Sequence, residues 1–269
     1  MLARTTISTL AAGAAALALA GWSGGTGSPR ATRSADNSPG AIAVDAELVI
    51  AVDVSNSMDP EEQALQREGY VTGLTSREFL SALQDGINGR IAITYFEWAG
   101  PFDQKIIIPW RLIDGPDTAD AVAKEIAAAP YRRAPRTSIY GALEFAKPLF
   151  NRSGYRGLRR IIDVSGDGTN NIGPSVTLMR DQVLAAGITI NGLPIMLNRP
   201  FGSGTDIANL DIYYEDCVIG GPGAFVIAIH DRAQFKEATR TKLVLEIAGT
   251  TPQSRVIRAQ VKPPRVYCS

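Results

Sequence analysis

Short apolar runs alternate with amphipathic stretches along most of the chain. Six apolar runs have the length of buried strands, at residues 47–53, 90–96, 105–110, 158–165, 188–195 and 224–229. The runs at 90–96 and 105–110 are separated by a turn at Gly100-Pro101, which predicts a hairpin with one antiparallel edge strand. Stretches of helical character separate most of the other runs, so those strands are predicted to be parallel.

The amphipathic stretches predict helices at residues 76–84, 117–128, 138–150, 174–186 and 234–247. A further helix begins at Pro60, where Asp59 and Glu62 form a capping-box pattern. Pro148 strains or ends the helix at 138–150. We therefore predict an α/β fold: a doubly wound, mostly parallel six-stranded sheet with helices on both faces. It forms one domain over residues 45–248.

Both ends of the chain lie outside this domain. Residues 1–20 combine a positive start at Arg4, an apolar stretch and small residues at Ala18 and Ala20, which is typical of a secretory signal peptide. An uncleaved N-terminal anchor is the alternative. Residues 21–44 are predicted to be a flexible linker, and residues 249–269 a C-terminal tail. The sequence thus predicts an exported protein, periplasmic or secreted, without a membrane span once the signal is removed.

Composition restricts the chemistry more than the fold. The 269 residues include 27 basic and 27 acidic ones, so there is no surplus of positive charge for binding nucleic acid. The single histidine, His230, excludes zinc sites with two histidines. Cys217 and Cys268 are the only cysteines, and in an exported protein we expect them to form a disulfide that pins the tail. A metal site would rest on carboxylates and hydroxyls.

Three polar clusters lie where doubly wound folds bind ligands, at the carboxyl ends of the strands. Asp53, Ser55 and Ser57 alternate after the first strand, so their side chains can point the same way. Thr137 precedes the helix at 138–150, and Asp167 lies in a glycine turn after the strand at 158–165. Two carboxylates and three hydroxyls suit Mg²⁺, with Mn²⁺ or Ca²⁺ as alternatives.

This set resembles the metal-ion-dependent adhesion site (MIDAS) of von Willebrand factor type A domains, in which Asp-x-Ser-x-Ser is joined by a distant Thr and a distant Asp. The resemblance covers nearly all of the chain after the signal and maps the motif onto Asp53, Ser55, Ser57, Thr137 and Asp167. The third loop departs from it, reading Ser-Gly-Asp-Gly where the family commonly shows Thr-Asp-Gly. The sequences at 65–70, 96–98 and 191–194 also resemble a bacterial exported group of such domains with no assigned function.

Other interpretations of these residues remain open. Asp-x-Ser-x-Ser is also typical of a helix-capping turn. An acid after a first strand resembles haloacid dehalogenase-type phosphatases, but those have a second acid where Ser55 stands. The glycine-rich run at 220–223 is interpreted as a tight turn and not as a phosphate cradle, and His230 as a structural residue.

The hypotheses for function fall into three classes. The resemblance implies a binding module, not an enzyme, whose ion captures an acidic side chain of a protein partner. By analogy, the helix at 234–247 would then shift on binding. A metal-assisted hydrolase and an interaction protein whose ion only stiffens the loops are the alternatives. Arg132, Arg133 and Arg136, just before Thr137, form either a solvated loop or a cationic collar for an acidic partner.

Overall fold

The computed structural model of the protein describes residues 40–197, 209–249 and 265–268. Its elements are β1 (Ile42–Asp53), α1 (Pro60–Leu74), α2 (Arg77–Gln84), β2 (Ile91–Trp98), β3 (Gln104–Ile113), α3 (Pro116–Ala128), α4 (Ile139–Ala146), η1 (Lys147–Arg152), β4 (Tyr155–Gly166), α5 (Val176–Ala185), β5 (Thr189–Pro194), α6 (Leu210–Tyr213), η2 (Tyr214–Val218), η3 (Arg232–Gln234) and α7 (Phe235–Ala248). The predicted signal peptide at 1–20, most of the linker and most of the tail lie outside the described residues.

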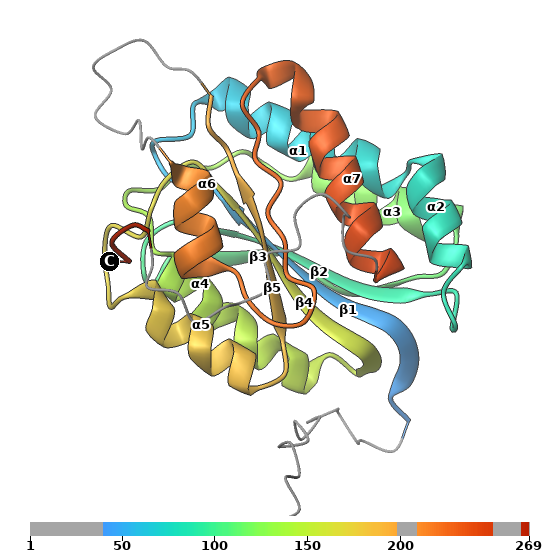
Figure 1. Ribbon diagram of the computed structural model, residues 1–269. Helices are drawn as coiled ribbons and strands as arrows, with labels where there is room; N and C mark the ends of the chain where they lie inside the picture. The colour runs from blue at the N-terminus through green and yellow to red at the C-terminus, as the bar shows by residue number, and fades with distance from the viewer. Residues whose placement is uncertain (1–39, 198–208, 250–264, 269) are drawn as a thin grey trace, which may run out of the picture. The chain divides into compact units, whose positions relative to one another are not determined.

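The five strands form one sheet in the order β3-β2-β1-β4-β5 (Figure 1). β1 pairs in parallel with β2 and β4, β4 pairs in parallel with β5, and β3 runs antiparallel to β2 at the edge. The predicted α/β class and the antiparallel edge strand are thus confirmed. None of the helices in the described ranges combines the length and hydropathy needed to cross a membrane.

The prediction of a sixth strand at 224–229 is wrong. This segment runs beside β5 and Ile195 and forms only isolated bridges there, Gly192 to Val226 and Ile195 to Ile229. Hydrogen bonds on both sides of the gap are present, from Ile227 N to Gly192 O and from Ile229 N to Pro194 O. The hydrogen bond between these two would need an N–H donor at position 194, and proline has none. Pro194 therefore interrupts the ladder, and the described residues form a sheet of five strands.

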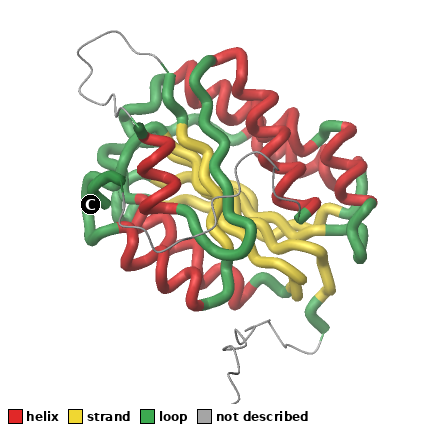
Figure 2. The backbone as a smooth tube through the Cα atoms, in the orientation of Figure 1, coloured by secondary structure: helices red, strands yellow, loops and turns green. Residues whose placement is uncertain are grey.

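Helices cover both faces of the sheet (Figure 2) because side chains alternate between faces along β1. Leu48, Ile50 and Val52 face a core shared with α1, α2, α3 and α7. Val49 and Ala51 face a second core shared with α4, α5, α6 and η2. The sheet is therefore buried on both sides, and only the ends of its strands are left to form a site.

A buried charged cluster ties α7 to the sheet. Lys242 Nζ lies 2.5 Å from Oδ1 of Asp163 on β4 and 2.5 Å from Oε1 of Glu246, and all three side chains are fully buried. Tyr70 of α1 donates to Asp163 Oδ2 at 3.1 Å, and Asn191 of β5 donates to Glu246 Oε1 at 3.0 Å. Two carboxylates therefore share one ammonium. Burial raises the pKa of Glu246, and the charge of Asp163 raises it further, to about 7.

Stability should therefore depend on the protonation of Glu246. The folded chain holds this proton more tightly than the unfolded chain, whose carboxyl has the ordinary pKa of 4.5. The stabilisation is complete below that value and is lost as pH rises through about 7. Glu246→Gln keeps an acceptor for Asn191 and cannot ionise. Its free energy of unfolding relative to wild type should rise between pH 5 and pH 8 by roughly 2 kcal/mol in urea titrations. A difference independent of pH would contradict this prediction.

Candidate metal site

Three loops meet at the carboxyl ends of β1 and β4. The first begins at Asp53, the last residue of β1, and the third contains Asp167, directly after β4. The middle loop leads into α4 and carries Thr137. It is attached to the first loop by a hydrogen bond from Ala134 N to Val54 O at 3.1 Å. The order of the strands thus brings together residues that are far apart in the sequence.

A chain of hydroxyls connects the first loop to the third. Ser57 Oγ donates to Asp167 Oδ1 at 2.6 Å, and the Oγ atoms of Ser55 and Ser57 are 2.8 Å apart. Because the Ser57 proton is directed to Asp167, Ser55 is the donor in the second bond. Asp53 Oδ1 accepts from Ser55 N at 2.7 Å, which folds the loop back on the end of β1. Four of the predicted site residues therefore form one contiguous set of oxygen atoms.

Asp53 is the least satisfied member of this set. Its side chain is completely buried, and Oδ2 has no hydrogen-bond partner in the described part of the chain. Burial raises the pKa of Asp53 well above its usual value, and the charge of Asp167 raises it further. Two acids close together, one of them buried away from water, are unfavourable without a cation. This pair is therefore arranged to gain from a positive charge.

Thr137, the fifth predicted residue, lies against the third loop. A Cβ added to Gly168 would be 3.8 Å from both Oγ1 and Cγ2 of Thr137, so this side chain lies against the glycine turn beside Asp167. The Thr137 amide donates to Asn171 Oδ1 at 2.9 Å, and Asn171 N donates back to Thr137 O at 2.9 Å. The middle and third loops are thus held together at the threonine.

Sequence reasoning missed the residues that support these loops. Asn170 Oδ1 accepts from Tyr140 N at 3.0 Å, so the third loop also holds the first turn of α4. Gln66 of α1 donates to Ser165 Oγ at 2.8 Å, behind the third loop. The consecutive asparagines after Gly-Asp-Gly are a local signal that could have suggested loop bonding, because asparagine commonly bonds to nearby backbone. Gln66 has no such signal, because its partner is 99 residues away.

The arginines before Thr137 do not act as one group. Arg132 is bound to buried Glu97 through Nε at 3.0 Å and to Asp103 at 2.5 Å. Arg67 of α1 reaches the other oxygen of Glu97 at 2.9 Å. Glu97 therefore lies between two guanidiniums and fixes the start of the middle loop. The interpretation of Arg132 as part of a solvated loop or a free collar is wrong, whereas Arg133 and Arg136 are exposed.

The glycine-rich run at 220–223 forms a tight turn, closed by a hydrogen bond from Ala224 N to Gly221 O at 3.2 Å. Gly221 and Gly223 have φ angles of 96° and 73°, a left-handed conformation that favours glycine. His230 is exposed, and its backbone amide donates to Gln234 Oε1 at 3.1 Å. Neither feature belongs to the three loops.

The donor set suits a hard divalent cation. No cluster of three or more histidine, cysteine, aspartate or glutamate side chains able to bind a metal exists within the described ranges. The candidate site differs from such a cluster, because it combines only two acids, Asp53 and Asp167, with hydroxyls. Carboxylate and hydroxyl oxygens are the ligands that Mg²⁺ and Mn²⁺ prefer. The unpartnered Asp53 oxygen is an observation of this structure that such an ion would explain.

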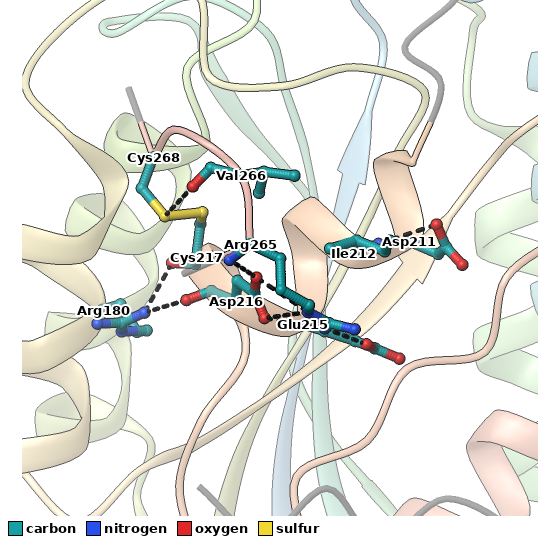
Figure 3. Close-up of polar contacts among 9 residues, drawn as sticks. All are labelled: Arg180, Asp211, Ile212, Glu215, Asp216, Cys217, Arg265, Val266 and Cys268. Atoms are coloured by element: carbon teal, nitrogen blue, oxygen red, sulfur yellow. Dashed lines mark hydrogen bonds and ion pairs between the residues drawn. A yellow bond between two sulfur atoms is a disulfide. The ribbon is translucent and has the colours of Figure 1, made fainter. Parts of the chain in front are cut away.

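Residues 265–268 are attached to η2 (Figure 3). Cys217 of η2 and Cys268 form a disulfide across a sequence separation of 51 residues. On the chain-entropy model, a loop of that length is stabilised by about 4 kcal/mol. Arg265 adds ion pairs to Glu215 at 2.6 Å and to Asp216 at 2.9 Å. Although burial acts the other way, the hydrogen bonds from Arg265 lower the pKa of Asp216.

The fold is that of von Willebrand factor type A domains. Proximal thread matrix protein 1 from the mussel byssus has a TM-score of 0.56 at 15% identity, covering 77% of this chain and 49% of that one. The pilus adhesin SpaC from Lactobacillus rhamnosus GG has a TM-score of 0.54 at 12% identity, covering 79% of this chain and 31% of that one. A von Willebrand factor type A protein from Catenulispora acidiphila has a TM-score of 0.51 at 14% identity, covering 76% of this chain and 43% of that one. This chain spans less than half of the length of each.

One of the mussel structures, at 18% identity and a TM-score of 0.53, has a zinc-occupied MIDAS motif. Residues 43–251 match the family model described as a protein of unknown function, DUF1194, and the chain belongs to this family. No curated protein matches the chain.

Proposed function

We propose that this protein is an exported binding module, not an enzyme, that uses a divalent ion to capture an acidic group of a protein partner. Asp53, Ser55, Ser57, Thr137 and Asp167 would hold the ion. The observation that carries the proposal is the buried Asp53 oxygen without a hydrogen-bond partner, in a site shared with Asp167. The zinc-occupied motif of the mussel protein and the adhesin SpaC are consistent with it.

The described chemistry accounts for capture in simple terms. Two carboxylates balance the charge of a divalent ion, and the hydroxyls complete part of its coordination shell. A position left open to solvent accepts water or a carboxylate from outside, and a carboxylate is the better ligand for a hard cation. Exposed Arg133 and Arg136 lie on the loop that carries Thr137, where positive charge favours the approach of an acidic surface.

Ion binding tests the proposal first. The EDTA-stripped chain, titrated with Mg²⁺, Mn²⁺, Zn²⁺ and Ca²⁺ in a calorimeter, should bind at least one ion at a single site. Partner capture from envelope extracts should then need that ion, and amide replacement of one acidic side chain of the captured partner should abolish it. Failure to bind any of the four ions, or capture that is unchanged in EDTA, would contradict the proposal.

A further inference from the structure

A second buried oxygen without a partner lies beside Asp53. Tyr214 opens the π-helical turn η2 and is completely buried, and its hydroxyl has no hydrogen-bond partner within the described ranges. Buried tyrosine hydroxyls normally find a partner. An unpaired one next to an unpaired carboxylate oxygen therefore needs an explanation.

The two oxygens approach the same face of Gly166, the last residue of β4. A Cβ added there would lie 2.8 Å from Asp53 Oδ2 and 3.0 Å from the Tyr214 hydroxyl. These distances put the two oxygens within about 6 Å of each other. They are not hydrogen-bonded directly. One water that pairs with both oxygens can bridge two buried oxygens at such a separation.

A second glycine makes room for the tyrosine ring. A Cβ added to Gly192 on β5 would lie 2.6 Å from Tyr214 Cδ1, closer than real side-chain atoms approach. Gly192 is paired with Val164, and Gly166 with Pro194, so both glycines lie on neighbouring strands. The ring thus crosses β5 to bring its hydroxyl to the end of β4.

The support of Tyr214 is rigid. Ile219 N donates to Tyr214 O at 2.9 Å, the bond that closes the π turn. Cys217, in the same turn, is bonded to Cys268, and Arg180 of α5 donates to Asp216 O at 2.8 Å (Figure 3). π-helical turns are rare and occur frequently at functional sites. The turn is therefore fixed from both α5 and the C-terminal end.

We propose that Tyr214 is a positioning residue of the metal site. Its hydroxyl pairs through one buried water with one lone pair of Asp53 Oδ2, which leaves the other lone pair for the ion and keeps this carboxylate oriented towards it. This inference rests on the proposed function. Outer groups that orient a ligand typically change metal affinity 10- to 100-fold when removed. Tyr214 would act only through Asp53 and would not contact the ion.

Tyr214→Phe tests the role because it keeps the ring and removes only the oxygen. We expect ion affinity to fall roughly 10- to 100-fold in calorimetry. The pH midpoint of ion binding should move to higher pH, because Asp53 loses a donor that favours its ionised form. The urea midpoint of the EDTA-stripped variant should change little, because the hydroxyl pairs with a water and not with another part of the chain.

Tyr155→Phe is the matched control. Tyr155 begins β4 at the end opposite Gly166, where it packs against Trp110, so ion affinity and pH midpoint should match wild type. Unchanged affinity and midpoint in Tyr214→Phe would overturn the inference, as would a loss of stability alone. Absence of ion binding in the unmodified chain would instead contradict the proposed function. A water between the two oxygens in a crystal structure would support the role of Tyr214.

Discussion

Asp53→Ala should abolish divalent-ion binding and leave the domain folded. The variant removes one of only two carboxylates in the proposed donor set and breaks its bond to Ser55 N. We expect the affinity for the ion to fall at least about 100-fold, equivalent to about 2.7 kcal/mol. Capture of the partner should be lost in parallel. Calorimetry with the EDTA-stripped variant measures the first effect directly.

The free energy of unfolding of the ion-free Asp53→Ala variant should be equal to that of wild type or higher. The Asp53 carboxylate is buried, is close to another acid and has one oxygen without a partner, so its removal relieves an unfavourable interaction in the ion-free chain. Asp181→Ala, an exposed acid on α5, is the control with the same change of charge, and it should bind the ion normally. Undiminished binding by Asp53→Ala would show that the ion is held elsewhere.

Lys242→Met should cause the largest loss of stability. The variant leaves Asp163 and Glu246 buried without their shared ammonium, whereas methionine retains most of the apolar volume. Removing one partner of a buried ion pair typically costs 3–5 kcal/mol, because the remaining charge is uncompensated. We expect a decrease of about 4 kcal/mol in the free energy of unfolding in urea at pH 7. The loss should shrink at pH 5, where Glu246 is protonated.

Lys236→Met provides a control on the same helix. Lys236 pairs with Glu68 at 2.7 Å, but its side chain is 56% exposed, so the same substitution should cost at most about 1 kcal/mol. Adding Glu246→Gln to Lys242→Met should restore part of the lost stability, because one of the two unpaired charges is then removed. Equal losses of stability in Lys242→Met and Lys236→Met would contradict the view that burial makes the cluster important for stability.

Much of the fold could be predicted because its signals are local. The capping box before α1 is present, with Glu62 N bonded to Asp59 Oδ1 at 2.7 Å, and α4 ends at Ala146, just before Pro148. The false sixth strand shows the limit of such signals. Residues 224–229 are apolar enough for a strand, but their pairing depends on Pro194 of the neighbouring strand. A property of the partner cannot be read from the segment itself.

The candidate site divides in the same way. Asp53, Ser55 and Ser57 share one short motif. In the structure Ser57 bonds to Asp167, and Ser55 bonds to Ser57. Tyr214 was not predicted, because it lies in a turn too short for helical periodicity and its role depends on glycines in two other strands. Chemistry carried by a motif can be found from sequence, whereas residues that approach only through packing cannot.

The charged cluster under α7 also limits how the helix can move. Sliding α7 by one turn, 5.4 Å, would take Lys242 away from Asp163 and separate Glu246 from Asn191. It would also break the bonds that Arg159 of β4 makes to Glu246 O and Ile247 O at the end of the helix. Several kcal/mol would oppose this motion, more than the 1–3 kcal/mol of a typical allosteric coupling. We therefore expect that any shift of α7 on partner binding is smaller than one helical turn.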